Sequence, residues 1–203
     1  MSVPTIPVTE PAIEPKPASE APAKAERAPL VDLLPTGTLR LLVAAASLVA
    51  VVASFVDFGL HGRALLGAVL CPALILLAAI DAKHKVLPND IILPTSLAVG
   101  LIVAATTPGD FLSHLAAGAA LGGFFFLFGT IFAGSLGMGD AKLGFLLGLA
   151  LGSKTLGATL VAFAGLLVAA LYVLAKRGTS ARKDAIPFGP FLALGGIVAF
   201  FLG

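Results

Sequence analysis

Two aspartates that end charge-free stretches are the residues of this sequence best suited to chemistry. Asp140 follows 29 residues, 111 to 139, that include no Lys, Arg, Asp or Glu, and it lies in the sequence Gly-Met-Gly-Asp-Ala-Lys. Asp81 follows a second stretch of this kind, residues 64 to 80. An ionised carboxylate beside hydrocarbon costs free energy, so we expect a chain that keeps two of them to use them.

A pair of carboxylates in a poorly solvated site supports acid–base catalysis. Two neighbouring negative charges repel, so one member keeps its proton while the other remains a base. The base draws a proton from water, and the acid polarises a peptide carbonyl and later protonates the leaving nitrogen. Gly137 and Gly139 allow backbone or substrate to approach Asp140 closely. The sequence therefore predicts peptide hydrolysis, provided that two acids 59 residues apart meet in space.

The composition places these acids in a membrane protein. The chain of 203 residues is 58% hydrophobic and 12% charged, far from the balance of a soluble domain. Its formal net charge of +2 is too small to indicate nucleic-acid binding. The single cysteine, Cys71, excludes an internal disulfide and a Cys-based zinc cluster. His61, His84 and His114 are scattered at no ligand spacing, so no metal site is predicted.

Seven hydrophobic segments predict an all-α, polytopic membrane bundle of about seven transmembrane helices. They are about 39–58, 63–81, 89–107, 111–135, 141–153, 155–175 and 187–203. Residues 1–37 differ, because they hold 8 of the 14 prolines and four glutamates, and they predict a disordered cytoplasmic tail. The 13 residues of 141–153 would rise about 20 Å as a helix. That is less than a hydrocarbon core of about 30 Å.

Loop charges favour a crossing by all seven segments. Three loops would then share one face: 82–88, 136–142 and 176–186. These loops carry seven Lys and Arg residues, and Arg40 lies at the same face, whereas the opposite loops hold only Arg63 and Lys154. By the positive-inside rule the basic face is cytoplasmic, and so is the N-terminus. Asp81 and Asp140 are therefore predicted at cytoplasmic helix ends.

Acids in an apolar chain also have other interpretations. A single aspartate at a helix end is more often a cap or an interfacial anchor, and this interpretation applies to Asp57, Asp90, Asp110 and Asp184. A small ion-coupled transporter also carries buried acids. Such acids lie more naturally near the midplane, in interrupted helices and often within an internal repeat, and no convincing repeat is visible here.

The first acid opens a longer pattern, Asp81-Ala-Lys-His-Lys-Val-Leu-Pro88-Asn89. This resembles the D-x6-P pattern, followed by N or D, of the type IV prepilin (leader) peptidases, which are GxGD aspartic membrane peptidases. A further proline usually follows in that family, and Pro94 matches it. The second catalytic aspartate of the family lies in G-D-x-K, which here reads Gly139-Asp140-Ala-Lys142.

A third stretch, residues 186–196, resembles the start of the last helix of that family. The resemblance covers about residues 63 to 203, the six-helix peptidase unit. The domain organisation expected from it is a tail at 1–37, an extra N-terminal transmembrane helix at 38–62, and a prepilin peptidase-like membrane domain at 63–203.

The resemblance implies a membrane endopeptidase that removes short basic leader peptides from pilin-like precursors, usually after Gly and before an apolar helix. The implied catalytic residues are Asp81 and Asp140, and the implied site-shaping residues are Gly137, Gly139, Lys142, Pro88 and Asn89. The expected location is the cytoplasmic face of the bacterial inner membrane. Expected partners are prepilins or pseudopilins and the lipid bilayer, with no nucleic acid and with homo-oligomerisation left open. No metal or other cofactor is implied, and water is the second substrate.

One departure from the family pattern concerns methylation. Many members carry an N-terminal cytoplasmic domain, often with paired CxxC motifs, that is associated with methylating the new pilin N-terminus. This sequence shows neither feature, so it resembles the compact peptidases of Tad/Flp-type pilus systems, and N-methylation is not predicted. A catalytically inactive pilus-assembly scaffold is a further alternative, against which the two intact acids argue.

Overall fold

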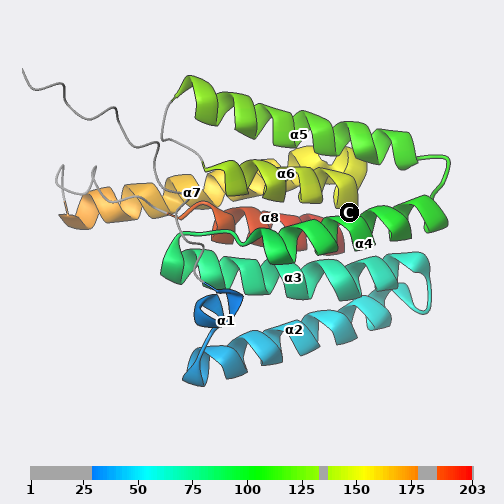
Figure 1. The fold of residues 1–203 in the computed structure, drawn as a ribbon, viewed down its shortest axis with the longest axis horizontal. Helices are drawn as coiled ribbons and strands as arrows, with labels where there is room; N and C mark the ends of the chain where they lie inside the picture. Colours follow the sequence, from blue (N-terminus) through cyan, green and yellow to red (C-terminus); the bar gives the residue numbers. More distant parts are fainter. Residues whose placement is uncertain (1–28, 133–136, 178–186, 203) are drawn as a thin grey trace, which may run out of the picture.

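The computed structural model describes residues 29–132, 137–177 and 187–202 (Figure 1). Within them it contains α1 (Leu30–Leu33), α2 (Gly37–Phe58), α3 (Gly62–His84), α4 (Asn89–Thr106), α5 (Phe111–Ile131), α6 (Met138–Leu151), η1 (Gly152–Lys154), α7 (Thr155–Arg177) and α8 (Gly189–Leu202). The described residues form no strand. Each of the seven predicted segments corresponds to one helix, α2 to α8.

Apolar length supports a membrane location for this bundle. Five helical stretches among the described residues are long and apolar enough to cross a membrane: Gly37–Phe58, Gly62–His84, Asn89–Thr106, Phe111–Ile131 and Met138–Val173, where the last joins α6 to α7. Helix α8 is apolar but shorter. The predicted all-α polytopic membrane bundle is confirmed.

Two of the helix boundaries that differ from the prediction concern the acids. Helix α3 continues past Asp81 to His84 and ends where Lys85 adopts the left-handed conformation, with φ 54°. Helix α6 begins at Met138, so Asp140 lies in its first turn rather than in the loop before it. An apolar run ends where charge appears, whereas a helix ends where its backbone is capped. Hydropathy therefore predicted α3 to end too early and α6 to begin too late.

Successive helices run back and forth between two ends of the bundle. In Figure 1, α3, α5 and α7 finish at the left-hand end, where α4, α6 and α8 begin. The turn between α6 and α7 lies at the other end and includes Gly152 at φ 57°, a conformation that glycine adopts at little cost. The last turn of α3 and the first turns of α6 and α8 therefore meet at one end.

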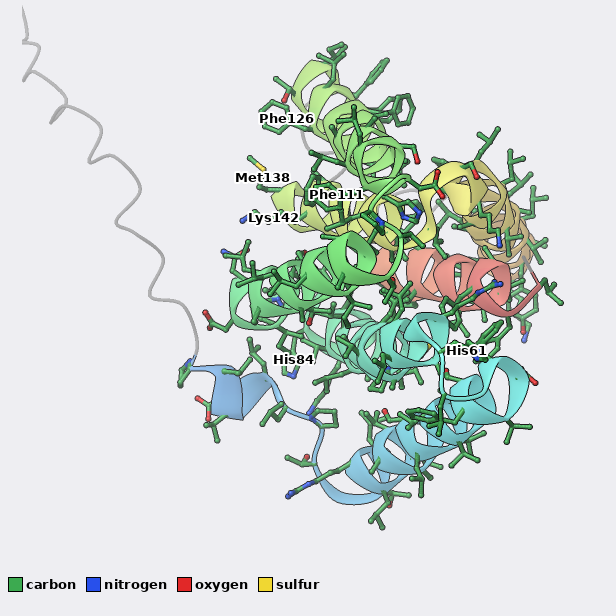
Figure 2. The ribbon with its side chains drawn as sticks, turned by 90° about the vertical axis from the view of Figure 1, so that its right-hand side faces the viewer. His61, His84, Phe111, Phe126, Met138 and Lys142 are labelled. Atoms are coloured by element: carbon green, nitrogen blue, oxygen red, sulfur yellow. The ribbon has the colours of Figure 1, made fainter. Side chains whose placement is uncertain are left out.

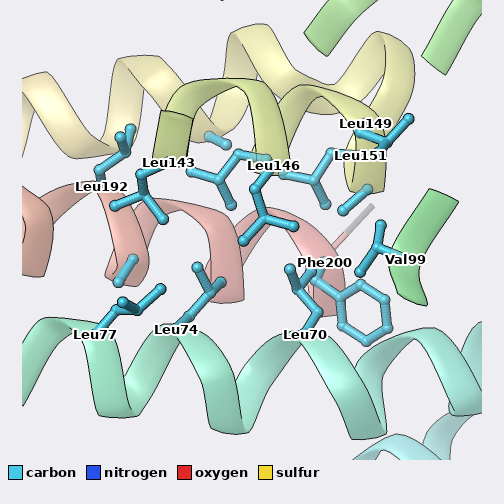
Figure 3. Packing of buried hydrophobic residues seen from close by; sticks show 14 of the residues in the cluster. Leu70, Leu74, Leu77, Val99, Leu143, Leu146, Leu149, Leu151, Leu192 and Phe200 are labelled. Atoms are coloured by element: carbon cyan, nitrogen blue, oxygen red, sulfur yellow. The ribbon is translucent and has the colours of Figure 1, made fainter. Parts of the chain in front are cut away.

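The core lies among α3, α6 and α8 (Figure 3). Its fully buried side chains include Leu70, Leu74, Leu77, Leu143, Leu146, Leu147, Leu192 and Phe200. Glycines on α8 allow the close approach, since a Cβ on Gly196 would meet the side chain of Leu147 and lie 3.2 Å from that of Leu74. Small residues at helix interfaces are the usual means by which membrane helices pack closely.

Helices α5 and α6 approach each other closely through their backbones. A Cβ placed on Gly148 of α6 would meet the backbone of Gly118 on α5. Conversely, a Cβ on Gly118 would lie 2.9 Å from the carbonyl oxygen of Phe145. Neither neighbour is a flexible side chain end, so any added methyl group must push the two helices apart.

The substitution Gly148→Ala is therefore expected to destabilise the bundle by about 1–3 kcal/mol, the usual effect of overpacking. Thermal unfolding of the purified protein in detergent measures this. Gly123→Ala is the matched control on α5, because nothing lies within 4 Å of an added Cβ there. Equal unfolding temperatures for the two variants would contradict the close approach.

Candidate active site

Asp81 lies in the last turns of α3 and is only 6% exposed. Its Oδ2 accepts a hydrogen bond from the backbone N–H of Gly189, at 3.0 Å. Gly189 is the first residue of α8, so this N–H has no acceptor within its own helix. The negative charge of the carboxylate is unfavourable near the C-terminal end of α3, where the helix dipole is also negative. The N-terminus of α8 is the positive end of its dipole and stabilises this charge.

Asp140 is placed by the start of its own helix. It occupies the third position of α6 and is half-buried. Its Oδ2 accepts the backbone N–H of Gly137, the N-cap residue, at 3.0 Å. This is the acid half of a capping box, in which a side chain reaches back to an N–H that the helix leaves unbonded.

The two acids lie at the same end of the bundle, Asp81 where α3 ends and Asp140 where α6 begins. Each is held through Oδ2 by a glycine N–H at the N-terminal end of a helix, α8 for Asp81 and α6 for Asp140. Catalysis by the pair requires that both acids lie at one end of the bundle, which spacing along the sequence could not establish.

The loop after Asp81 packs against the glycine motif of Asp140. A Cβ on Gly139 would lie 2.7 Å from Cβ of Leu87, so this contact requires glycine. Pro88, the next residue, is buried at the N-cap position of α4. By contrast, Gly137 is exposed, and an added Cβ would come no nearer than 3.6 Å to Oδ2 of Asp140.

A hydrogen bond between side chains joins the two motifs. Nζ of Lys142, on α6, donates to Oδ1 of Asn89, the first residue of α4, at 2.7 Å. The predicted site-shaping residues Pro88, Asn89, Gly139 and Lys142 thus converge where α4 begins beside α6. Lys142 contacts a neighbouring helix, which favours a positioning role over a purely electrostatic one.

Sequence reasoning missed one contributor to the site. Gly189 lies in the stretch 186–196 that resembles the family's last helix, but nothing in its spacing indicated that it would bind Asp81, 108 residues away. Asp90 is exposed in the first turn of α4, where an acid is favourable to the helix dipole. Among the described residues, no group of three His, Cys, Asp or Glu side chains could hold a metal ion.

A cavity lies at the end of the bundle opposite the two acids, which is the end that faces the viewer in Figure 2. It has a volume of about 580 Å³, and its lining includes His61, Arg63, His114 and Lys154. Neither Asp81 nor Asp140 lines it. Because it is remote from both acids, we place the candidate active site at the end where α6 and α8 begin.

Comparison with known proteins gives this arrangement a family. The sequence pattern of the type IV leader peptidase family matches residues 68–174 of this chain. This range is more than half of the chain and includes both acids. The chain belongs to the type IV leader peptidase family. Gly189 lies outside the matched range, so its contact with Asp81 is seen in the structure and does not follow from the family match.

Two relatives illustrate the similarity. A prepilin leader peptidase/N-methyltransferase of Burkholderia pseudomallei (strain 1026b) is 36% identical over 154 residues, which cover 72% of this chain and 49% of the relative. A protein of the same description from Bacillus subtilis (strain 168) is 34% identical over 160 residues, covering 74% of this chain and 61% of the relative. The chain thus spans about half to three-fifths of the length of these relatives. No solved structure matches it.

The bond between Lys142 and Asn89 predicts coupled effects of substitution. Lys142→Met and Asn89→Leu are each expected to lower the free energy of unfolding by about 1–3 kcal/mol, because each leaves a polar partner unsatisfied. The double variant should lose less than the sum of the two, and thermal unfolding in detergent measures the difference. As a control, Lys83→Met removes an exposed lysine near the same end and should be additive with Asn89→Leu. Strict additivity for Lys142→Met would show that the bond contributes nothing.

Proposed function

We propose that this chain is a membrane aspartic endopeptidase that cleaves leader peptides from type IV prepilin-like precursors. The observation that carries the proposal is that Asp81 and Asp140 lie at the same end of the bundle, each held by a glycine N–H at a helix N-terminus. Membership of the type IV leader peptidase family and the names of the two relatives supply the class of substrate.

The proposed reaction uses the two carboxyl groups in opposite protonation states. The ionised carboxylate takes a proton from water as the water oxygen attacks the scissile carbonyl carbon. The protonated carboxyl donates a hydrogen bond to the carbonyl oxygen and so stabilises the developing negative charge. When the C–N bond breaks, the protonated carboxyl group gives its proton to the leaving nitrogen. A new carboxyl terminus then remains on the leader.

The glycine N–H groups prepare the acids for these roles. Within the described residues, the hydrogen bonds to both carboxyl groups go to Oδ2, which leaves Oδ1 of each for water and substrate. A fixed carboxyl group loses no free energy to reorientation at the moment of reaction. Both donors belong to the backbone at helix ends, so their positions follow from the packing of α6 and α8.

The proposed substrate approaches along the membrane. A substrate with an apolar helix in the bilayer would place the junction between this helix and its soluble leader at the membrane interface. The two acids lie at helix ends, where this junction would be. Four lysines also lie at this end of the bundle: Lys83, Lys85, Lys142 and Lys176. By the positive-inside rule, we infer from them that the active site and the N-terminus lie on the cytoplasmic side of the bacterial inner membrane. We also infer that residues 63–203 form the peptidase unit and that α2 precedes it.

Each aspartate is expected to be essential for processing. Asp81→Asn or Asp140→Asn removes one half of the acid–base pair, so cells that co-express either variant with a candidate prepilin should accumulate the precursor. The measurement is the gel shift of the precursor, with immunoblots showing that both variants insert at normal levels. Asp90→Asn is the matched control, because Asp90 is exposed on the neighbouring helix α4.

Processing at the normal rate by either aspartate variant would remove that residue from the mechanism. Failure of the wild type to process any prepilin, together with proton-coupled uptake of a solute, would favour a transporter instead. Failure without such uptake would favour an assembly scaffold.

The contact between Gly189 and Asp81 predicts a second sensitive position. In Gly189→Ala the new Cβ would lie 2.6 Å from Oδ2 of Asp81, so the carboxyl group must move. Displacement of a catalytic group by about 1 Å lowers activity on the order of 100-fold. The initial rate of precursor cleavage measures this effect. Gly157→Ala is the control, with nothing within 4 Å of its Cβ, and equal rates for the two variants would contradict the assigned contact.

A further inference from the structure

The two basic residues at the end of the bundle opposite the acids line one cavity. Loop charges assign only Arg63 and Lys154 to this end, and both line the cavity of about 580 Å³ that lies there. His61, labelled in Figure 2, and His114 line it as well. Among the described residues that line the cavity, Asp110 supplies the one carboxylate. Its lining therefore carries more positive than negative charge.

The cavity lies where α3, α5 and α7 begin. Gly62 and Arg63 are the first two residues of α3, and Ser113 lies in the first turn of α5. Ser153 and Lys154 directly precede α7. All five residues line the cavity. The first N–H groups of a helix have no partner within it, and its dipole is positive at that end, so these helix ends favour an anion in the cavity.

Arg63 has donors left for such an anion. One of its terminal nitrogens donates to the carbonyl oxygen of Phe200 at 2.8 Å, and its guanidinium carbon lies 4.2 Å from the centre of the Phe58 ring. Within the described residues this is the one hydrogen bond that Arg63 makes. A guanidinium carries five N–H donors in a fixed fork, which matches two oxygens of a phosphate.

The two histidines are held by backbone carbonyl groups. Nδ1 of His61 lies 2.7 Å from the carbonyl oxygen of Phe58, and Nδ1 of His114 lies 2.9 Å from that of Leu149. A carbonyl oxygen only accepts, so Nδ1 of each ring donates, and Nε2 takes no part in these bonds. Capping of the C-terminal ends of α2 and α6 accounts for both bonds. Capping alone does not require that the same side chains surround a cavity.

One wall of the cavity is apolar. Its buried lining residues are Leu66, Val103, Ala150, Leu151 and Phe200. The volume lies within the range of about 300–1,000 Å³ that is usual for small-molecule sites. A ligand that fits this lining combines an anionic group with a less polar body.

We propose that this cavity binds a phosphate group, carried by the headgroup of a phospholipid or by a small soluble phosphate ester. Arg63 binds two of the phosphate oxygens through its fork, and Lys154 adds positive charge. The apolar wall contacts the glycerol and the first acyl carbons where the ligand is a lipid. The site lies at the opposite end of the bundle from Asp81 and Asp140, so it does not depend on the proposed peptidase reaction.

Binding to the purified full-length protein in detergent tests the site and its source of phosphate. Native mass spectrometry compares phosphatidylglycerol with a diacylglycerol of the same chains, which lacks the phosphate, and calorimetry measures the binding of glycerol 3-phosphate. A dissociation constant for phosphatidylglycerol at least about ten-fold lower than that for the diacylglycerol supports a lipid, since a hydrogen bond to a charged group contributes on this order. Binding of glycerol 3-phosphate supports a soluble ester. Neither result would overturn the proposal.

Arg63→Lys tests the role of the guanidinium fork. Lysine keeps the positive charge but cannot form two parallel bonds to phosphate, so the affinity for the phosphate probe that binds should fall on the order of ten-fold. Unchanged affinity would contradict the assigned role of Arg63. The unfolding temperature without the probe shows whether the bundle itself is altered.

Ser113→Asp tests whether the phosphate lies in this cavity. Ser113 is exposed, and an acid in the first turn of a helix is favourable to its dipole, so the variant should fold. The added negative charge should weaken binding of the phosphate probe on the order of ten-fold or more. Ser113→Asn is the matched control, with nearly the same shape and no charge, and it should bind as the wild type does. Equal affinities in the two variants would overturn the assignment to this cavity.

Discussion

The arrangement of the site depends on holding two carboxyl groups at one end of an apolar bundle. Neighbouring acids repel, and poor solvation makes each charge more costly. The chain meets this constraint with helix N-termini, whose unbonded N–H groups and dipoles favour negative charge. Helix α6 supplies the N–H of Gly137 to Asp140, and α8 supplies the N–H of Gly189 to Asp81. The second bond crosses between helices, so tertiary packing must position it.

The glycines of the bundle fulfil that requirement. A Cβ on Gly195 of α8 would meet the backbone of α7 at Ala158, and one on Gly196 would meet Leu147 of α6. Helix α8 can therefore settle deeply among its neighbours, which brings its first residue against Asp81. The same principle places Leu87 on Gly139, so that the loop after Asp81 packs against the helix that carries Asp140. The glycines that allow the helices to pack closely thus also determine the geometry of the site.

Much of this fold could be predicted from the sequence, because hydropathy reports which residues lie in apolar surroundings. Each of the seven segments contains one helix among the described residues, and the aspartates stood out because their charge conflicts with those surroundings. Hydropathy could not report that α3 continues through Lys83 and His84, since that end depends on the left-handed conformation of Lys85. Nor could it reveal the bonds from Gly189 to Asp81 or from Lys142 to Asn89. These pairs are far apart in sequence, and only helix packing brings them together.

Phe125 shows how closely the parts of this site depend on one another. Its ring is buried against Gly144 of α6, where an added Cβ would lie 2.7 Å from it, and it also contacts Phe188 and Phe163. Phe125 thus joins α5, α6, α7 and the residue that precedes α8. Phe188 leads directly into the N–H that holds Asp81, so the ring of Phe125 also braces the segment that positions this carboxyl group. The orientation of Asp81 therefore depends on this packed aromatic cluster as well as on its own helix.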